Sequence, residues 1–460
     1  MKLTSYGAAL EVTGSNHVLD IGGRKIAVDC GMFQGHRIDA EKKNREFKYD
    51  PSELEAVILT HGHCDHCGRL PHLCASGFQG NIFSTPACRD IAGLIMADTA
   101  HIQAKDAEWL RKKKPDHPFQ PLYGIDEVVE SLNQFMTVGY GRSFHVTDGA
   151  KCVFRDAGHI LGSAMAVIEL EDGRRIAFTG DMGRAGLPII RDPQPIGDVD
   201  YLICEGTYGD RLHDPIEDAE KELAQVVNET VERGGRIIIP AFAVERTQEL
   251  VYYLHKLTRE GKIPELDIYV DSPMGTNATS IFRVHQECYG PEIREVFLED
   301  HVNPFGFDGL HFTSSVAESK KLNELTKPHI VISSSGMCEA GRILHHLKNN
   351  IENPNNTILI VGYMAAHTLG RRIADRLPEV KIFGESYRLR AKVKILNTFS
   401  AHADYNEILR YVKKLNLTRL RKMFLVHGED HALENLRGLL LEAGVKAVEI
   451  VEPEMEYELP

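Results

Sequence analysis

The chain has 460 residues, of which 43% are hydrophobic and 26% are charged, a composition typical of soluble globular proteins with two or three domains. No apolar run reaches the ~18–20 residues that a membrane-spanning helix needs, and the first residues form no apolar signal sequence, so we expect a cytoplasmic protein without a membrane partner. The net charge of −13 argues against a broad basic surface but is compatible with a local basic groove. The nine cysteines lie mostly in apolar runs, which fits reduced thiols better than a disulfide framework.

The first predicted element is a hairpin near the N-terminus. Two apolar strands, residues 18–21 and 25–29, flank the turn formed by Gly22 and Gly23. Asp29 ends the second strand, and a carboxylate at a strand end is commonly a turn cap.

The most informative stretch follows the apolar run of residues 56–59. It places His61, His63, Asp65 and His66 within six residues. A buried strand that ends in such a cluster delivers the side chains from a fixed point into a loop. Imidazole nitrogen and carboxylate oxygen are ligands that suit a Lewis-acidic divalent ion, zinc above all, so this stretch predicts a metal site.

Three later polar residues share this position at the end of an apolar run. They are His159, Asp181 and His427. Each one alone is explained equally well as a cap or a hydrogen-bonded loop residue. Together with the four residues of the first cluster, they form a ligand set sufficient for two ions.

The segment up to residue 205 contains strands joined by hairpins, which predicts a sandwich of two sheets with helices outside. After residue 205, short apolar strands alternate strictly with helices, and this alternation predicts a parallel, doubly wound sheet. The expected helices are 215–233, 245–260, 273–288 and 339–349, and the expected strands are 236–239, 267–270, 330–332 and 358–361. We therefore expect a first domain over residues 1–205, an inserted domain over 206–384, and a return to the first domain over 385–460.

Two segments of this later part are candidates for phosphate binding. Ser333, Ser334, Ser335 and Gly336 lie between a strand and a helix, where hydroxyls and backbone N–H groups form a phosphate cradle; a plain turn with caps is the alternative. Basic residues then alternate with apolar ones, which predicts one basic face on a single strand, or simply a solvated strand face. These basic residues are Arg388, Arg390, Lys392 and Lys394, and Arg246 is a further candidate phosphate ligand.

The metal-binding motifs resemble those of a known superfamily. The pattern His61-x-His63-x-Asp65-His66, followed by His159 and by Asp181 in Thr-Gly-Asp, is similar to that of the metallo-β-lactamase superfamily. Three further motifs resemble its β-CASP branch of nucleic-acid-processing nucleases, and they occupy residues 204–210, 399–404 and 425–429. The resemblance runs nearly end to end and is strongest to prokaryotic relatives of the nuclease subunit that cuts pre-mRNA 3′ ends. One departure is Gly206, where the branch often has serine.

The resemblance implies an α/β (α+β) fold: a four-layer αββα sandwich with an inserted doubly wound parallel β-CASP domain that caps the metal site. It also implies two Zn²⁺ ions per chain. His61, His63 and His159 would hold one ion, Asp65, His66 and His427 the other, and Asp181 both; Asp65 would count among the catalytic residues as well. Asp29 would orient the motif histidines from behind.

The same resemblance implies a mechanism. Two ions ~3.5–4 Å apart share a hydroxide that attacks the phosphodiester. His402 would act as the general acid on the departing 3′ oxygen, and Glu205 would orient it. The alternative for His402 is a residue that merely neighbours the cap of a helix starting at Asp404.

The expected function is therefore a zinc-dependent ribonuclease that cuts single-stranded RNA endonucleolytically and leaves 5′-phosphate and 3′-hydroxyl ends. The alternatives are a 5′→3′ exoribonuclease, a small-molecule hydrolase of the superfamily, and a non-catalytic scaffold. The DNA-repair members of the branch lack a histidine at the position of His427, which favours RNA. Because the chain is acidic, a homodimer surface that helps to hold RNA is a further expectation.

Overall fold

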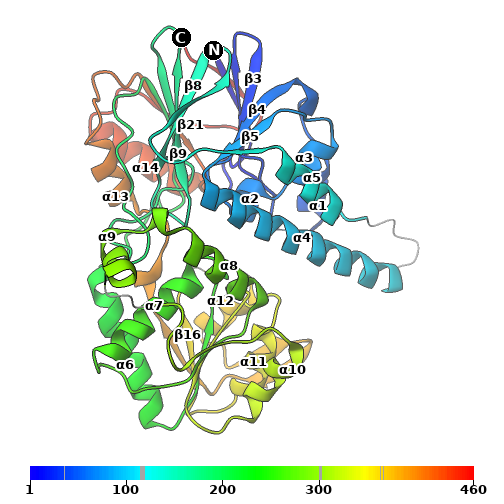
Figure 1. Cartoon of the computed structure of the whole chain (residues 1–460), viewed down its shortest axis with the longest axis vertical. Coiled ribbons are helices and arrows are strands. Elements are labelled where there is room, and N and C mark those ends of the chain that lie inside the picture. Colours follow the sequence, from blue (N-terminus) through cyan, green and yellow to red (C-terminus); the bar gives the residue numbers. More distant parts are fainter. Residues whose placement is uncertain (36, 114–119, 300–302, 363, 366) are drawn as a thin grey trace. The chain divides into compact units, whose positions relative to one another are not determined.

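The computed structural model describes residues 1–460 except 36, 114–119, 300–302, 363 and 366. The chain divides into two compact units (Figure 1). The first unit comprises residues 1–185, 191–212 and 401–460, and the second comprises residues 186–190 and 213–400. The second unit is thus inserted into the sequence of the first.

The first unit is built on two seven-stranded mixed sheets. One sheet has the order β22 (Glu456–Glu458), β1 (Lys2–Gly7), β2 (Asn16–Ile21), β3 (Arg24–Val28), β4 (Leu54–Ile58), β5 (Asn81–Ser84), β6 (Phe135–Thr137). The other has the order β21 (Val448–Ile450), β20 (Lys422–Val426), β11 (Tyr201–Glu205), β10 (Arg175–Phe178), β9 (Ala164–Leu170), β8 (Ala150–Asp156), β7 (Ser143–Thr147). The predicted hairpin is present as antiparallel β2 and β3, with Leu19 opposite Ile26.

Three hydrophobic clusters show how the sheets and helices form layers. Buried residues from the facing sides of both sheets make a central core, in which Leu19 and Ile26 of one sheet pack with Ile168 of the other. The outer face of the first sheet packs on α3 and α4, and the outer face of the second packs on α13 and α14. The helices of this unit are α1 (Arg37–Arg45), α2 (Cys64–Cys67), α3 (Leu70–Ala75), α4 (Pro86–Lys113), α5 (Ile125–Asn133), α13 (Tyr405–Val412) and α14 (Asp430–Glu442). The predicted four-layer αββα sandwich is confirmed (Figure 1).

Strand register brings distant parts of this sequence to one edge. Strand β11 pairs in parallel with both β10 and β20, so that Phe178 lies opposite Ile203 and Glu205 lies opposite Val426. Because parallel strands end at the same edge, the residues just after β10, β11 and β20 become neighbours. These are the positions at which the sequence carries Asp181, Glu205 and His427.

The second unit contains the predicted parallel sheet. Its order is β14 (Leu310–Phe312), β13 (Ile268–Val270), β15 (Ile330–Ser333), β12 (Ile237–Pro240), β16 (Thr357–Ile360), β19 (Lys392–Ile395), and every pairing is parallel. Its helices are α6 (Ala219–Glu232), α7 (Arg246–Arg259), α8 (Pro273–Val284), α9 (Pro291–Arg294), α10 (Val316–Lys321), α11 (Ile343–Asn350) and α12 (Leu369–Ala374). One face of the sheet packs on α11 and α12, and Figure 1 shows α7 on the other side. The doubly wound arrangement is therefore confirmed.

The expected return to the first domain at residue 385 is too early. Residues 385–400 belong to the second unit, because β19 pairs in parallel with β16, with Ile358 opposite Val393. The hairpin of β17 (Glu379–Ile382) and β18 (Glu385–Arg388) precedes it in the same unit. The chain re-enters the first unit only at Ala401.

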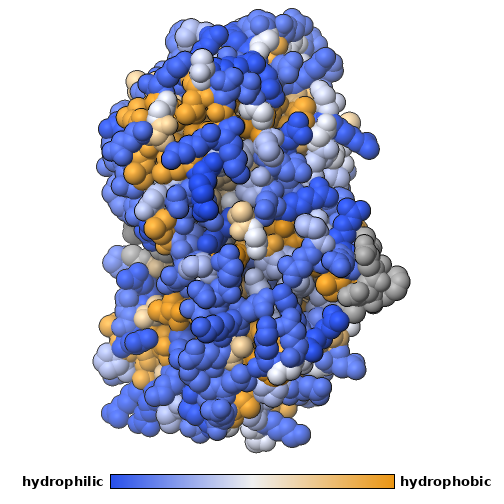
Figure 2. Space-filling view, turned by 90° about the vertical axis from the view of Figure 1, so that its left-hand side faces the viewer, coloured by the Kyte–Doolittle hydropathy of each residue, from blue (hydrophilic) through white to orange (hydrophobic). Residues whose placement is uncertain are grey.

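The face of the molecule in Figure 2 is mostly hydrophilic, and its apolar side chains lie in separate groups. Among the described residues, no helix combines the length and the apolar character that a bilayer crossing would require.

The core between the two sheets should dominate the stability of the first unit. Ile168 is fully buried between the sheets, so Ile168→Ala should lower the free energy of unfolding by about 2–5 kcal/mol, because it leaves a cavity. The matched control is Val129→Ala on α5, where the side chain is 53% exposed and the loss should stay within about 0.5 kcal/mol. The midpoints of urea unfolding measure both. Equal losses would contradict the assignment of Ile168 to the inter-sheet core.

Candidate metal centre

The seven side chains predicted as metal ligands meet at one edge of the first unit. Two groups have their ligand atoms within 4.8 Å of one another: the first consists of His61, His63, His159 and Asp181, and the second of Asp65, His66 and His427. The members come from the ends of β4, β8, β10 and β20 and from the short helix α2. The fold therefore collects them from four separate parts of the chain.

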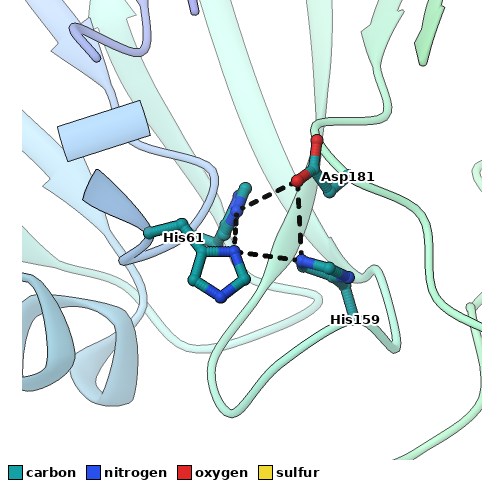
Figure 3. A group of neighbouring side chains, drawn as sticks. His61, His159 and Asp181 are labelled. Atoms are coloured by element: carbon teal, nitrogen blue, oxygen red, sulfur yellow. Dashed lines mark hydrogen bonds and ion pairs between the residues drawn. The ribbon is translucent and has the colours of Figure 1, made fainter. Parts of the chain in front are cut away.

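The first group surrounds a common point. His61 Nε2 lies 3.1 Å from His63 Nδ1, and His159 Nε2 lies 3.2 Å from the same atom. Asp181 Oδ2 lies 3.4 Å from His61 Nε2 and 3.5 Å from His159 Nε2. In Figure 3 the rings of His61 and His159 direct nitrogen atoms toward the carboxylate of Asp181.

The second group lies on the other side of Asp181. His66 Nε2 is 3.3 Å from His427 Nε2, and His427 Nε2 is 3.5 Å from Asp65 Oδ2. The second carboxylate oxygen of Asp181, Oδ1, is 3.3 Å from His66 Nε2. Asp181 thus presents one oxygen to each group.

The environment of Asp181 fits a metal ligand. Its side chain is only 2% exposed, and Oδ1 has no hydrogen-bond partner among the residues that the structure describes. Such a buried, unsatisfied carboxylate oxygen is costly unless a cation neutralises it. Gly180 precedes it with φ +54°, and a Cβ at Gly180 would lie 2.7 Å from Thr60, so glycine permits this close approach.

The spacing of the ligand atoms also fits zinc. Tetrahedral zinc with Zn–N bonds of about 2.0–2.1 Å separates its ligand atoms by about 3.3 Å. The separations of 3.1–3.5 Å within the first group agree with this value. Nitrogen and carboxylate donors without a thiolate are the set expected of a catalytic zinc site.

Three of the histidines are held by hydrogen bonds at the ring nitrogen Nδ1. His159 Nδ1 donates to the carbonyl of Ala401 at 3.3 Å. His427 Nδ1 lies 3.0 Å from Thr207 Oγ1, whose proton goes to the His427 carbonyl, so the ring donates. By the same reasoning His61 Nδ1 donates to Thr60 Oγ1, which donates to Asp29. Each bond leaves Nε2 with a free electron pair toward the centre.

The sequence analysis missed Thr60, Thr207 and the Ala401 carbonyl. Thr60 immediately precedes the first histidine and Thr207 follows Glu205 by two residues, but a threonine beside a motif is not by itself a signal. Asp29 was singled out, and its Oδ2 lies 2.7 Å from His66 Nδ1.

Burial sets the protonation of the first group. It lowers the pKa of His63 to about 3 and lowers the pKa of His159 well below the ordinary value. Both imidazoles are therefore neutral near pH 7, which is the form that binds metal.

Glu205 and His402 form a pair beside this centre. His402 Nδ1 lies 3.1 Å from Glu205 Oε2, and Glu205 also accepts the backbone N–H of Met182 at 2.5 Å. The bond from Met182, together with one from the Thr207 N–H at 3.4 Å, holds Glu205 although Gly206 supplies no hydroxyl. Burial lowers the pKa of His402, but the Glu205 and Asp181 carboxylates outweigh this effect and raise it to about 9.

The serine loop of the second unit follows β15. Ser333 Oγ donates to the carbonyl of Asp271 at 2.8 Å, and Ser334 Oγ lies 2.8 Å from Ser272 Oγ. Ser335 accepts the N–H groups of Glu339 and Ala340. Gly336 is buried against the ring of Phe242, a residue that the sequence analysis did not single out and that is 45% exposed.

The predicted basic strand face is wrong as a single strand. Arg388 ends β18, which pairs with β17, whereas Lys392 begins β19, which pairs with β16. Between them, the N–H groups of Arg390 and Ala391 both donate to the Ile351 carbonyl and break the extended run. Arg388, Arg390 and Lys392 are exposed, while Lys394 is half-buried and pairs with Glu229 at 3.0 Å.

Arg246 lies at the start of α7, and its guanidinium is neither exposed nor unpaired. It is 6% exposed, its guanidinium pairs with Glu249, and it lies 5.6 Å from the ring centre of Phe399.

The four-layer sandwich with a histidine and aspartate cluster at its strand ends defines a metallohydrolase of the metallo-β-lactamase type. Three family models match the chain: the metallo-beta-lactamase superfamily over residues 11–81, the Beta-Casp domain over 247–373, and the Zn-dependent metallo-hydrolase RNA specificity domain over 386–450.

Similarity to individual proteins extends over nearly the whole chain. It is 37% identical to Ribonuclease TTHA0252 of Thermus thermophilus over 96% of both chains. It is 32% identical to Transcription termination factor FttA of Methanosarcina mazei, over 95% of this chain and 68% of that protein. It is 31% identical to an RNase J-like protein of Methanocaldococcus jannaschii, over 88% of this chain and 87% of that protein.

A crystal structure of a protein of unknown function from Enterococcus faecalis V583 has the same fold, with a TM-score of 0.58, 13% identity, and coverage of 100% of this chain and 99% of that chain. The chain belongs to the metallo-β-lactamase superfamily and, within it, to the β-CASP family of metal-dependent RNA hydrolases.

Removing metal should destabilise the first unit, because an ion that binds only the folded chain adds to the free energy of unfolding. At a free zinc concentration of about 1,000 times Kd the contribution is about 4 kcal/mol. A chelator should therefore lower the midpoint of thermal unfolding, and Asp181→Ala should largely abolish that difference. His145→Ala, which replaces an exposed histidine on β7, should retain it. An unchanged midpoint after verified metal removal would contradict the assignment.

Proposed function

We propose that the protein is a zinc-dependent endoribonuclease that cuts single-stranded RNA and leaves 5′-phosphate and 3′-hydroxyl ends. The observation that carries the proposal is the Glu205–His402 pair, which lies beside Asp181 and forms a third close group with it. A general acid placed against the carboxylate shared by both ligand groups suits the cleavage of a phosphodiester. The similarity to proteins named as a ribonuclease and as RNase J-like supports RNA as the substrate.

The ligand groups support two zinc ions per chain. His61, His63 and His159 would hold one ion, Asp65, His66 and His427 the other, and Asp181 would contact both. When bound, the zinc pair supplies an activated water and stabilises the negative charge that builds on the phosphate. The protein fixes four of the histidines before substrate arrives, because their Nδ1 atoms are already hydrogen-bonded to Asp29, Thr60, Thr207 and Ala401.

His402 is the proposed general acid. Its Nδ1–H is held by Glu205, so the opposite ring nitrogen, Nε2, is left to give a proton to the departing 3′ oxygen. The His402 side chain is 20% exposed, whereas Glu205 is fully buried, so the pair has one accessible end. Glu205 therefore acts as the positioning residue.

We assign RNA contacts in the second unit to the serine loop and to exposed basic residues. Ser334, Ser335 and Gly336, with Ser333 as support, would contact a phosphate. Phe242 offers an exposed ring beside this loop on which a base could stack, which favours a single strand. Arg388 and Lys392 would contact the RNA backbone, and Arg246 would do so only by giving up its ion pair with Glu249.

The acid role predicts a loss of cleavage without a loss of metal. His402→Ala should reduce the rate of single-stranded RNA cleavage by about 10²–10⁴-fold, because the 3′ oxygen must leave unprotonated. Zinc per chain, measured by elemental analysis, should stay at the wild-type value near two. His431→Ala, which removes a histidine that is 60% exposed on α14, should cleave normally. Normal cleavage by His402→Ala would remove the acid role.

The endonuclease assignment predicts cleavage of RNA without ends. A circular single-stranded RNA should first be converted to a full-length linear product and then to shorter fragments, because internal phosphodiesters are accessible. The matched substrate is the same sequence in linear form with a 5′ phosphate. Degradation of the linear form with the circle intact would replace the proposal with a 5′→3′ exoribonuclease.

A further inference from the structure

We infer that Ser5, His17 and Ser15 form a one-way hydrogen-bond relay that positions Asp29 and, through it, the metal-binding ring of His66. The inference rests on the proposed zinc centre and adds three positioning residues to it. The side chains of these three residues bond to one another and to Asp29, and His66 is reached through Asp29. They act from the core between the two sheets, behind the centre.

The relay is continuous and buried. Ser5 Oγ lies 2.8 Å from His17 Nδ1, and Ser15 Oγ lies 3.3 Å from His17 Nε2. Ser15 Oγ donates to Asp29 Oδ2 at 3.2 Å, and the same oxygen lies 2.7 Å from His66 Nδ1. All five side chains are at most 4% exposed.

The register of the first sheet places these residues together. Ser5 of β1 lies opposite His17 of β2, and His17 lies opposite Val28 of β3, directly before Asp29. Ser15 directly precedes β2. The alignment of three strands therefore determines where the imidazole lies.

The chemistry of the donors gives the relay a direction. An ionised carboxylate only accepts, so the Ser15 hydroxyl must give its proton to Asp29. Ser15 Oγ then accepts from His17, which places the ring proton on Nε2. His17 Nδ1 is left as an acceptor for the Ser5 hydroxyl. At the other end, His66 donates its Nδ1–H to Asp29 and keeps the Nε2 electron pair for metal.

Backbone contacts tie the same segment to the ligand loop. The Ser15 N–H donates to the Asp65 carbonyl at 2.8 Å, and Asn16 Nδ2 donates to the Asp29 carbonyl at 2.7 Å. Asp29 has φ +63°, a conformation that a non-glycine residue keeps only when its surroundings hold it. Burial lowers the pKa of His17 to about 4, which agrees with a neutral ring carrying a single proton.

A purely structural histidine would fill the same space without transmitting an orientation, and the variants separate the two roles. His17→Leu fills the space of the ring with an apolar side chain but removes both hydrogen bonds. His17→Gln can accept from Ser5 and donate to Ser15, so it is the conservative rescue. Val18→Ala, in the same strand and buried in a different cluster, is the control for ordinary destabilisation.

The main measurement is zinc affinity, by competition with a chromophoric chelator, in protein whose folding is verified by its thermal midpoint. His17→Leu should weaken binding of one zinc by about 10-fold or more, and His17→Gln should stay within about twofold of wild type. Val18→Ala should lower the midpoint without changing either affinity. Equal affinities in wild type and His17→Leu, or equal weakening in His17→Leu and His17→Gln, would overturn the relay.

Nitrogen-15 NMR of the histidine rings supplies a readout that needs neither activity nor metal. The His17 proton should reside on Nε2 in the metal-free and the zinc-loaded protein, and a proton on Nδ1 would overturn the relay. RNA cleavage is scored separately. Zinc binding without RNA cleavage would contradict the proposed function but not the relay. A wild-type chain that does not bind zinc would contradict both.

Discussion

A buried carboxylate at the centre of a histidine cluster is the constraint on which the first unit depends. Asp181 is 2% exposed and faces ring nitrogens on both sides, with one oxygen directed at each ligand group. Burying such a charge is unfavourable unless cations neutralise it, and a metal centre meets this requirement. The two sheets of the first unit and the loops at their strand ends bring ligands to this residue from distant parts of the chain.

Strand pairing brings several of these distant residues together. Because β10, β11 and β20 are parallel neighbours, the residues that follow them meet without long loops. Four of the histidine ligands then need only a fixed ring orientation, and a hydrogen bond at Nδ1 provides it. Asp29, Thr60, Thr207 and the Ala401 carbonyl do this from four separate segments. The metal site is therefore prepared by the packed interior rather than by the loops alone.

The second unit also contains a buried carboxylate, which holds a loop in place. Asp271 is fully buried at the end of β13, and its carboxylate accepts from Ser319 at 2.6 Å, Arg342 at 2.7 Å and His346 at 2.6 Å. Its backbone carbonyl accepts from Ser333, the first residue of the serine loop. A satisfied buried carboxylate of this kind rigidifies its surroundings. It thereby holds the loop that we assign to phosphate binding.

Local patterns in the sequence were sufficient to predict three features of the protein. They are the metal-binding motif from His61 to His66, the strand-end positions of His159, Asp181 and His427, and the alternation of strands and helices in the inserted unit. These features are readable because periodicity and ligand chemistry are local properties. Two features were decided only by the tertiary structure. The basic run from Arg388 to Lys394 keeps its period of two, yet it divides between two strands, because β18 and β19 pair with different partners. The partners that orient the ligands, from Thr60 to the Ala401 carbonyl, carry no motif, since an ordinary hydroxyl or carbonyl acquires this role only when distant strands place it against an imidazole.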